Sequence, residues 1–217
     1  MAHTATFVGP MHGLGDTNMG WLDVAGMWHQ SLPHVKFILP NAPTAPVTLN
    51  GGMQMPSWFD IASLDELTGQ QYTGLDGAAK VVESLIQEEV AAGIPHDRIV
   101  VGGFSQGGAL SLFAGLQYPA RLAGICVLSG WLAGEDKFSL APEAVDTPVG
   151  HFHGVVDPVV RIEYGRESMR RVREQGIQNY HMKEYPDLPH SASMEEIEDV
   201  TAWLKDKLPT LDAGSAV

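Results

Sequence analysis

The sequence predicts a single α/β domain, in which a mostly parallel central sheet carries helices on both faces. Short apolar runs of strand length alternate along the chain with longer segments of helical spacing. Several of these runs are almost continuously apolar, as is typical of strands buried on both faces. The length of 217 residues suits one hydrophobic core. We therefore expect one domain over residues 1–217, with a frayed tail at 212–217.

The strands are predicted from apolar runs of strand length, several of them rich in β-branched residues. In chain order the runs are Phe7 to Met11, Val35 to Leu39, Arg98 to Val101, Leu122 to Leu128, Val149 to Phe152 and Tyr180 to Tyr185. The first run contains Gly9-Pro10, which is unusual because proline has no N–H for the ladder of a buried strand.

Helices are predicted where apolar residues recur with a period of 3.6. Between residues 81 and 90 the apolar residues follow this period, and Gly93-Ile94-Pro95 ends the helix. Ala109 to Tyr118 and Ile162 to Val172 follow strands in the same way. Ser191 to Leu208 closes the chain as an amphipathic helix.

The stretch from Pro40 to Thr73 is rich in Pro, Gly and Asn, and it is predicted to be irregular. A connection of this length is uncommon in a compact domain unless it is functional. Its apolar residues, which include Met53, Trp58, Phe59 and Leu64, favour a lid or binding loop. The alternative is a loop that packs its aromatic residues for its own stability.

Composition narrows the classes of function and partner. The formal net charge of −13 opposes association with polyanions, so we expect no nucleic-acid partner. The only cysteine, Cys126, lies in an apolar run, which excludes an intramolecular disulfide and indicates a reducing compartment. The N-terminus lacks the features of a secretory signal, and no apolar run is long enough to span a bilayer. We expect a cytoplasmic protein, a monomer or weak homodimer, with only transient membrane contact.

The segment Gly103-Phe104-Ser105-Gln106-Gly107 matches the pattern G-x-S-x-G. It follows a predicted strand and precedes a predicted helix, which is the context of the nucleophile in the α/β-hydrolase fold. In that context Ser105 occupies a strained turn that projects its Oγ from the sheet. The Gln106 N–H lies at a helix N-terminus, where it can hold an oxyanion. These features predict Ser105 as a nucleophile.

A serine needs a base, and in this fold the chain order is serine, acid, histidine. Of the nine histidines, only His181 and His190 follow every plausible acid. His181 lies inside a predicted strand, whereas His190 lies in the loop before the last helix, so His190 is the predicted base. Asp157, in the turn after Val149 to Phe152, is the predicted acid. Asp187 is its rival, although its place three residues before His190 favours a solvated turn residue.

Two further features concern oxyanion binding and metals. A Gly-rich loop, His12-Gly13-Leu14-Gly15-Asp16, follows the first strand and is expected to supply a second oxyanion donor. His151 and His153 form a pair, but no third histidine or carboxylate motif converges on them. We interpret both as structural, and we expect neither a metal nor a cofactor.

Five ordered motifs along nearly the whole chain resemble the acyl-protein thioesterase group of carboxylesterases and lysophospholipases. They are Met11 to Thr17, Pro56-Ser57-Trp58-Phe59-Asp60, Gly102 to Ser111, His153-Gly154 with Asp157-Pro158, and His190-Ser191. The resemblance implies hydrolysis of fatty-acyl thioesters on S-acylated proteins, of small carboxylic esters and of lysophospholipids.

The same resemblance implies roles for further residues. Leu14 and Gln106 would provide the oxyanion-hole amides. An acyl channel would be lined by Met53, Trp58, Phe59, Leu64 and Trp131. The chain departs from the family at three places: Val155 stands where an acidic residue is usual, Arg161 where a proline is usual, and Leu188-Pro189 where a glycine is usual.

Three functions remain open from the sequence. The first is a thioesterase that depalmitoylates proteins, and the second is a general carboxylesterase or lysophospholipase acting on small or lipid esters. The third is a non-catalytic acyl-lipid binder on the same scaffold, against which the complete set of Ser105, Asp157 and His190 argues. Thioester and oxoester hydrolysis need the same catalytic groups, so the sequence does not separate the first two.

Overall fold

The computed structural model describes residues 3–211. The tail at 212–217, expected to be frayed, lies outside the described residues. Within them the main sheet has six strands in the order β2-β1-β5-β6-β7-β8, and every neighbouring pair is parallel. The strands are β1 (Ala5–Met11), β2 (Val35–Ile38), β5 (Ile99–Phe104), β6 (Gly124–Leu128), β7 (Val149–Gly154) and β8 (Tyr180–Tyr185). The parallel sheet predicted from the sequence is confirmed.

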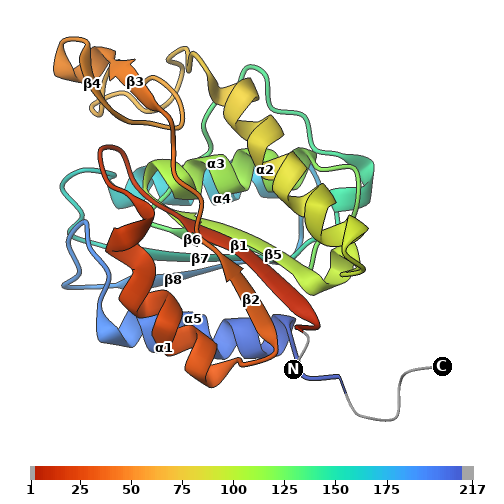
Figure 1. The fold of residues 1–217 in the computed structure, drawn as a ribbon. Helices are drawn as coiled ribbons and strands as arrows, with labels where there is room; N and C mark the ends of the chain where they lie inside the picture. Colours follow the sequence, from red (N-terminus) through yellow and green to blue (C-terminus); the bar gives the residue numbers. More distant parts are fainter. Residues whose placement is uncertain (1–2, 212–217) are drawn as a thin grey trace.

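Helices cover both faces of this sheet (Figure 1). They are α1 (Leu22–Ser31), α2 (Leu75–Ala91), α3 (Gln106–Gln117), α4 (Ile162–Glu174) and α5 (Met194–Lys207). Helices α1 and α5 pack on one face and α2, α3 and α4 on the other. Short 3-10 helices occur at Asn18–Trp21, Thr48–Asn50, His96–Arg98 and Pro142–Ala144.

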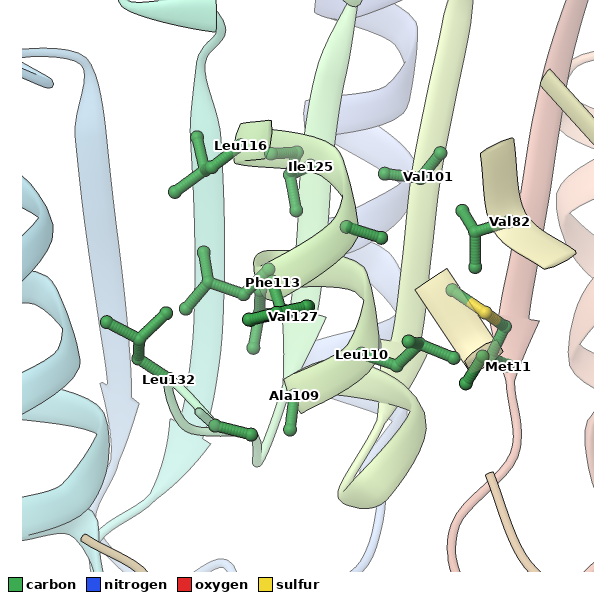
Figure 2. Packing of buried hydrophobic residues seen from close by; sticks show 14 of the residues in the cluster. Met11, Val82, Val101, Ala109, Leu110, Phe113, Leu116, Ile125, Val127 and Leu132 are labelled. Carbon is green, nitrogen blue, oxygen red and sulfur yellow. The ribbon is translucent and has the colours of Figure 1, made fainter. Parts of the chain in front are cut away.

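Two packed clusters, one on each face, bury the apolar runs. Helix α3 lies against the centre of the sheet, where Leu110 and Phe113 contact the apolar side chains of β5 and β6 (Figure 2). All of α3 from Gln106 to Leu116 is buried. Burying a side chain such as Leu110 or Phe113 stabilises the fold by about 1.5–3 kcal/mol. The residue that precedes α3 is therefore held by a helix that is buried along nearly its whole length.

Strand β1 continues through Gly9-Pro10, whose peptide bond is cis. Its pairing with β5 shifts register between Val8 and Met11, so the proline interrupts the ladder where the strand is irregular. The strand still extends to Met11, which brings the loop of residues 12–16 to the carboxyl edge of the sheet.

The prediction of an irregular segment from Pro40 to Thr73 was wrong in part. The strands β3 (Thr44–Val47) and β4 (Met53–Pro56) form an antiparallel hairpin separate from the main sheet (Figure 1). These strands are short, mostly exposed and contain prolines. They therefore lack the alternation of apolar and polar residues by which a strand is recognised in a sequence. Residues 57 to 74 have no regular structure.

Helix α1 was not predicted from the sequence. Only Ala25 and Trp28 of its residues are buried, and Gly26 interrupts the segment. Its apolar stripe is therefore too narrow to give a clear 3.6-residue period. Within the described residues, no helix is long and apolar enough to cross a membrane.

Candidate active site

Ser105 lies between the end of β5 and the start of α3, with a backbone φ of 54° and ψ of −118°. A non-glycine residue in such a conformation stores of order 1–3 kcal/mol of strain. The Ser105 N–H donates to the Leu128 carbonyl at 2.8 Å, which ties the turn to the neighbouring strand.

Both glycines of the motif are required by close backbone approaches. A Cβ on Gly107 would lie 2.1 Å from the Met11 carbonyl oxygen, and one on Gly103 would lie 2.4 Å from the Gly107 carbonyl carbon. No side chain can be accommodated at these distances. The sharp turn that exposes Ser105 is therefore only possible with glycine at both positions.

His190 lies in the loop between β8 and α5, with Ser105 on one side of its ring and Asp157 on the other. Its Nε2 is 3.0 Å from Ser105 Oγ, and its Nδ1 is 2.7 Å from Asp157 Oδ2. The imidazole packs against Phe104 with the ring centres 4.7 Å apart. Because a carboxylate only accepts, Nδ1–H donates to Asp157 and Nε2 is free to accept from the serine hydroxyl.

Asp157 follows β7, and its side chain is fully buried. Its Oδ1 accepts from the Val159 and Val160 N–H groups at 2.8 and 2.9 Å. Burial acts to raise the pKa of Asp157, but the bonds from His190 and from the two amides outweigh it and hold the pKa below its ordinary value. The structure thus presents an ionised carboxylate to His190. Asp187 is exposed in the turn after β8 and makes no hydrogen bond with His190.

The loop after β1 lies directly against Ser105, since a Cβ on Gly13 would be 3.4 Å from Ser105 Cβ. His12 braces this loop: its Nδ1–H donates to the Gly13 carbonyl at 2.8 Å, and its Nε2 accepts from the Ala42 N–H at 3.0 Å. Trp58 Nε1–H donates to the His12 carbonyl at 2.9 Å. Gly13, the residue before Leu14, is therefore held beside the serine.

The Gln106 side chain has a structural role that sequence analysis missed. Its Oε1 accepts from the Trp58 N–H at 2.9 Å, and its Nε2 donates to the Phe59 carbonyl at 2.7 Å and to Ser57 Oγ at 3.1 Å. Its backbone N–H begins α3 at a helix N-terminus, which favours negative charge. The sequence signal for this role was the motif Pro56 to Asp60, because it contains the three residues that the Gln106 side chain contacts.

Of the five residues predicted to bind an acyl chain, Phe59 and Trp131 pack against each other, with their ring centres 6.4 Å apart and edge to face. Trp131 is 1% exposed and donates to Tyr72 Oη at 2.9 Å, while Leu64 is partly buried in the segment beside it. Trp58 and Phe59 line a cavity of about 700 Å³ between the hairpin and α2, to which Ser105 does not contribute. Met53 lies on β4 and is 64% exposed.

Arg161, one of the three departures from the family pattern, contacts the irregular segment. Its Nη2 donates to the Asp65 carbonyl at 3.2 Å and to Tyr164 Oη at 2.9 Å. The Tyr164 hydroxyl donates to the same Asp65 carbonyl. Gln70 closes the segment on itself through bonds to the backbone of Ser63. We call residues 62–70 the strap, because the Arg161 and Tyr164 side chains, at the start of α4, bind it to the body of the protein through the Asp65 carbonyl.

The other two departures lie at the carboxyl end of β7. Val155 is 36% exposed, and its N–H donates to the Tyr185 carbonyl at 2.8 Å. The backbone at Leu188 approaches β7 so closely that a Cβ on Gly154 would lie 1.9 Å from its carbonyl oxygen. The Pro189 carbonyl accepts from the Ser191 N–H at 2.8 Å, which closes the turn around His190.

His151 and His153 hydrogen-bond to each other and to protein groups. Among residues 3–211, no group of three or more His, Cys, Asp or Glu side chains is placed to hold a metal ion.

A serine, a histidine and an aspartate in one hydrogen-bonded row, at the carboxyl edge of a parallel sheet covered by helices, define a serine hydrolase of the α/β-hydrolase class. The chain belongs to the phospholipase/carboxylesterase family, whose model matches residues 3–208.

Similar proteins include acyl-protein thioesterase 1 of Cryptococcus neoformans, 44% identical over 224 residues that cover 95% of this chain and 94% of the relative. Acyl-protein thioesterase 1 of Mycosarcoma maydis is 45% identical, with 92% and 90% covered. Among solved structures, Arabidopsis thaliana SOBER1 has a TM-score of 0.87 at 34% identity, covering 95% of this chain and 100% of that one. Zea mays acyl-protein thioesterase 2 has a TM-score of 0.79 at 31% identity, covering 96% and 95%.

Proposed function

We propose that this protein is an acyl-protein thioesterase, which hydrolyses fatty-acyl thioesters on S-acylated proteins and also cleaves carboxylic esters. The observation that carries the proposal is the continuous row Ser105–His190–Asp157. The names of its relatives supply the substrate class. General carboxylesterase or lysophospholipase activity on small or lipid esters is the second candidate, because the family that matches the chain is named for phospholipases and carboxylesterases.

In the first half-reaction, Ser105 Oγ attacks the acyl carbonyl while His190 Nε2 takes the hydroxyl proton. The carbonyl oxygen becomes an oxyanion, and we assign the Leu14 and Gln106 amides as the donors that hold it. Asp157 stabilises the imidazolium that forms on His190. The tetrahedral intermediate then expels the thiol or alcohol, which receives the proton from His190, and the acyl group stays on Ser105.

In the second half-reaction, a water molecule gives its proton to His190 and attacks the acyl-serine carbonyl. The bond to Ser105 Oγ breaks, the serine regains the proton from His190, and the fatty acid leaves. No cofactor enters this scheme.

For the acyl chain we propose a site built from the segment around Trp131 and Leu64, with Trp58, Phe59 and Met53 contributing from the hairpin side. Aromatic and aliphatic side chains of this kind suit an alkyl chain. Because a buried methylene contributes about 0.8 kcal/mol, four additional carbons would raise kcat/KM by roughly two orders of magnitude.

The test is a panel of matched thioesters and oxoesters with acyl chains from acetyl to palmitoyl, with kcat/KM measured for each. We expect kcat/KM to rise at least from acetyl to octanoyl. Ser105→Ala should abolish turnover and also the mass shift produced by a fluorophosphonate probe. A wild-type protein that takes up no probe and turns over no member of the panel would leave only an acyl-lipid binder.

The acyl-site residues are tested by the slope of kcat/KM against chain length in Trp131→Ala and Met53→Ser, with thermal midpoints measured alongside. We expect a smaller slope in both variants. A lowered midpoint with an unchanged slope for Trp131→Ala would show that this residue only fills the core and would leave a short-chain esterase.

A further inference from the structure

A second row of hydrogen bonds lies buried beneath the Asp157 loop. Tyr180 Oη is 2.8 Å from His151 Nδ1, and His151 Nε2 is 3.1 Å from His153 Nδ1. His153 Nε2 is 2.8 Å from the Val160 carbonyl oxygen. Tyr180, His151 and His153 are all 0% exposed, and they connect β8, through β7, to the loop after β7.

The Val160 carbonyl, at the end of the row, determines which group donates and which accepts in each bond when the imidazole rings are neutral. The Val160 carbonyl can only accept, so His153 carries its proton on Nε2 and its Nδ1 accepts when the ring is neutral. His151 must then donate from Nε2, and its own Nδ1 accepts from the Tyr180 hydroxyl. When both rings are neutral, the row therefore runs one way, from Tyr180 to Val160, and both rings are protonated on Nε2.

Burial favours these protonation states. It lowers the pKa of His151 well below its ordinary value and also lowers the pKa of His153, while it raises the pKa of the Tyr180 hydroxyl. The titratable groups that face His153 are Asp157 and His190 in the loops, and Glu184 on β8, which pairs with Arg166 of α4. Helix α4 itself presents Gly165, where a Cβ would lie 2.9 Å from His153 Nδ1.

The row ends on the backbone that holds the catalytic carboxylate. Val160 accepts from His153 with its carbonyl and donates its N–H to Asp157 Oδ1 at 2.9 Å. His153 Nε2 also lies 3.7 Å from Asp157 Oδ2, the oxygen that accepts from His190. A positive charge on His153 would therefore attract the Asp157 carboxylate oxygen that His190 uses.

We propose that His153 is a positioning residue for hydrolysis, and that His151 and Tyr180 keep it neutral and protonated on Nε2 so that the Asp157 carboxylate is reserved for His190. This inference rests on the proposed function, in which Asp157 supports His190 as the base. It gives a role to the histidine pair, which the reaction scheme does not otherwise use.

The first experiment compares His153→Leu with His153→Gln, which retains an N–H that can reach the Val160 carbonyl. We expect His153→Leu to lower kcat about tenfold with little change in KM, because a misplacement of about 1 Å costs roughly 10²-fold and a shift transmitted through the Val160 backbone is smaller. The acid limb of kcat/KM should move to lower pH, since a misplaced Asp157 stabilises protonated His190 less. His153→Gln should recover most of kcat, and His181→Leu, an exposed histidine of β8, is the matched control.

A second experiment does not depend on turnover or on folding of a variant. Long-range proton–nitrogen NMR of the wild-type imidazoles should show His151 and His153 neutral and protonated on Nε2 at pH 6. A charged ring or an Nδ1–H tautomer at either residue would overturn the inference, as would a His153→Leu variant with a lowered thermal midpoint but unchanged kcat and acid limb. Absence of Ser105-dependent turnover in the wild type would instead contradict the proposed function.

Discussion

The Nδ1 atom of His190 lies 2.7 Å from Oδ2 of Asp157, although 33 residues separate the two in sequence. The bond fixes which imidazole nitrogen faces Ser105. Asp157→Asn removes the carboxylate that selects this tautomer, so we expect kcat to fall roughly 10⁴-fold with the fold retained. Circular dichroism and steady-state kinetics on a soluble ester check both parts. Asp187→Asn is the matched control, and a larger loss there than in Asp157→Asn would reverse the assignment of the acid.

The pH dependence of activity should reflect a single group on the acid side. Only neutral His190 can accept the Ser105 proton, so kcat/KM should rise with pH as His190 loses its proton. Asp157, whose pKa is held below its ordinary value, remains ionised throughout that rise. We therefore expect an acid limb with a slope of one proton, measured with an ester for which chemistry is rate-limiting. A flat profile from acid to neutral pH would argue against a histidine base.

Stability should depend on the ionisation of Glu196 in the first turn of α5. Within residues 3–211, neither of its carboxyl oxygens has a hydrogen-bond partner, and burial is the main cause that raises its pKa to about 8. In the unfolded chain this carboxyl has the ordinary glutamate pKa of about 4.5, so the folded protein keeps a proton that the unfolded chain releases. The free energy of unfolding should therefore decrease from about pH 4.5 to pH 8, by roughly 4 kcal/mol from this group.

Glu196→Gln keeps the shape of the side chain but cannot ionise. Urea denaturation at pH 5 and pH 8 should show that the stability of the variant relative to the wild type increases with pH. Burying the glutamine amide of the variant in place of the carboxyl costs the same free energy at both pH values, so this cost cancels when the difference between variant and wild type at pH 5 is compared with that at pH 8. Glu195→Gln, at an exposed neighbouring position, should give no such change, and a difference between wild type and Glu196→Gln that is the same at both pH values would contradict the prediction.

The strap should limit the length of acyl chain that the protein accepts. Its Leu67 is fully buried beside Tyr72 and Trp131, so a long chain can reach that apolar region only if the strap moves. Arg161→Ala removes the bonds to Asp65 and Tyr164, each worth about 1 kcal/mol. We expect the ratio of kcat/KM for octanoyl over acetyl esters to rise about fivefold.

Arg166→Ala is the matched control for the strap, because Arg166 lies on the same helix but pairs with Glu184 instead. An octanoyl-to-acetyl ratio that changes equally in both variants would mean that charge on α4, rather than the hold on the strap, affects the substrate.

Local physical chemistry explains which elements could be predicted from sequence. Most strands of the main sheet lie in short apolar runs, and α2, α4 and α5 have apolar faces while α3 is apolar throughout, so their signals lie within a short window. Helix α1 buries little more than Trp28 and Ala25, and the hairpin β3–β4 is mostly exposed. Neither element has a strong local pattern, because packing against distant residues stabilises them.

The sequence by itself indicated the turn at Ser105 through the glycines at 103 and 107, and it predicted His190 and Asp157 from chain order and from their places in loops after strands. Only the tertiary structure decided that Asp157 rather than Asp187 contacts His190, and that Arg161 reaches Asp65. It also decided the path of the bonds from Tyr180 through His151 to His153. The physical reason is that a hydrogen bond is made over about 3 Å, and residues far apart in the chain come within that distance only when the sheet, its loops and its helices have packed.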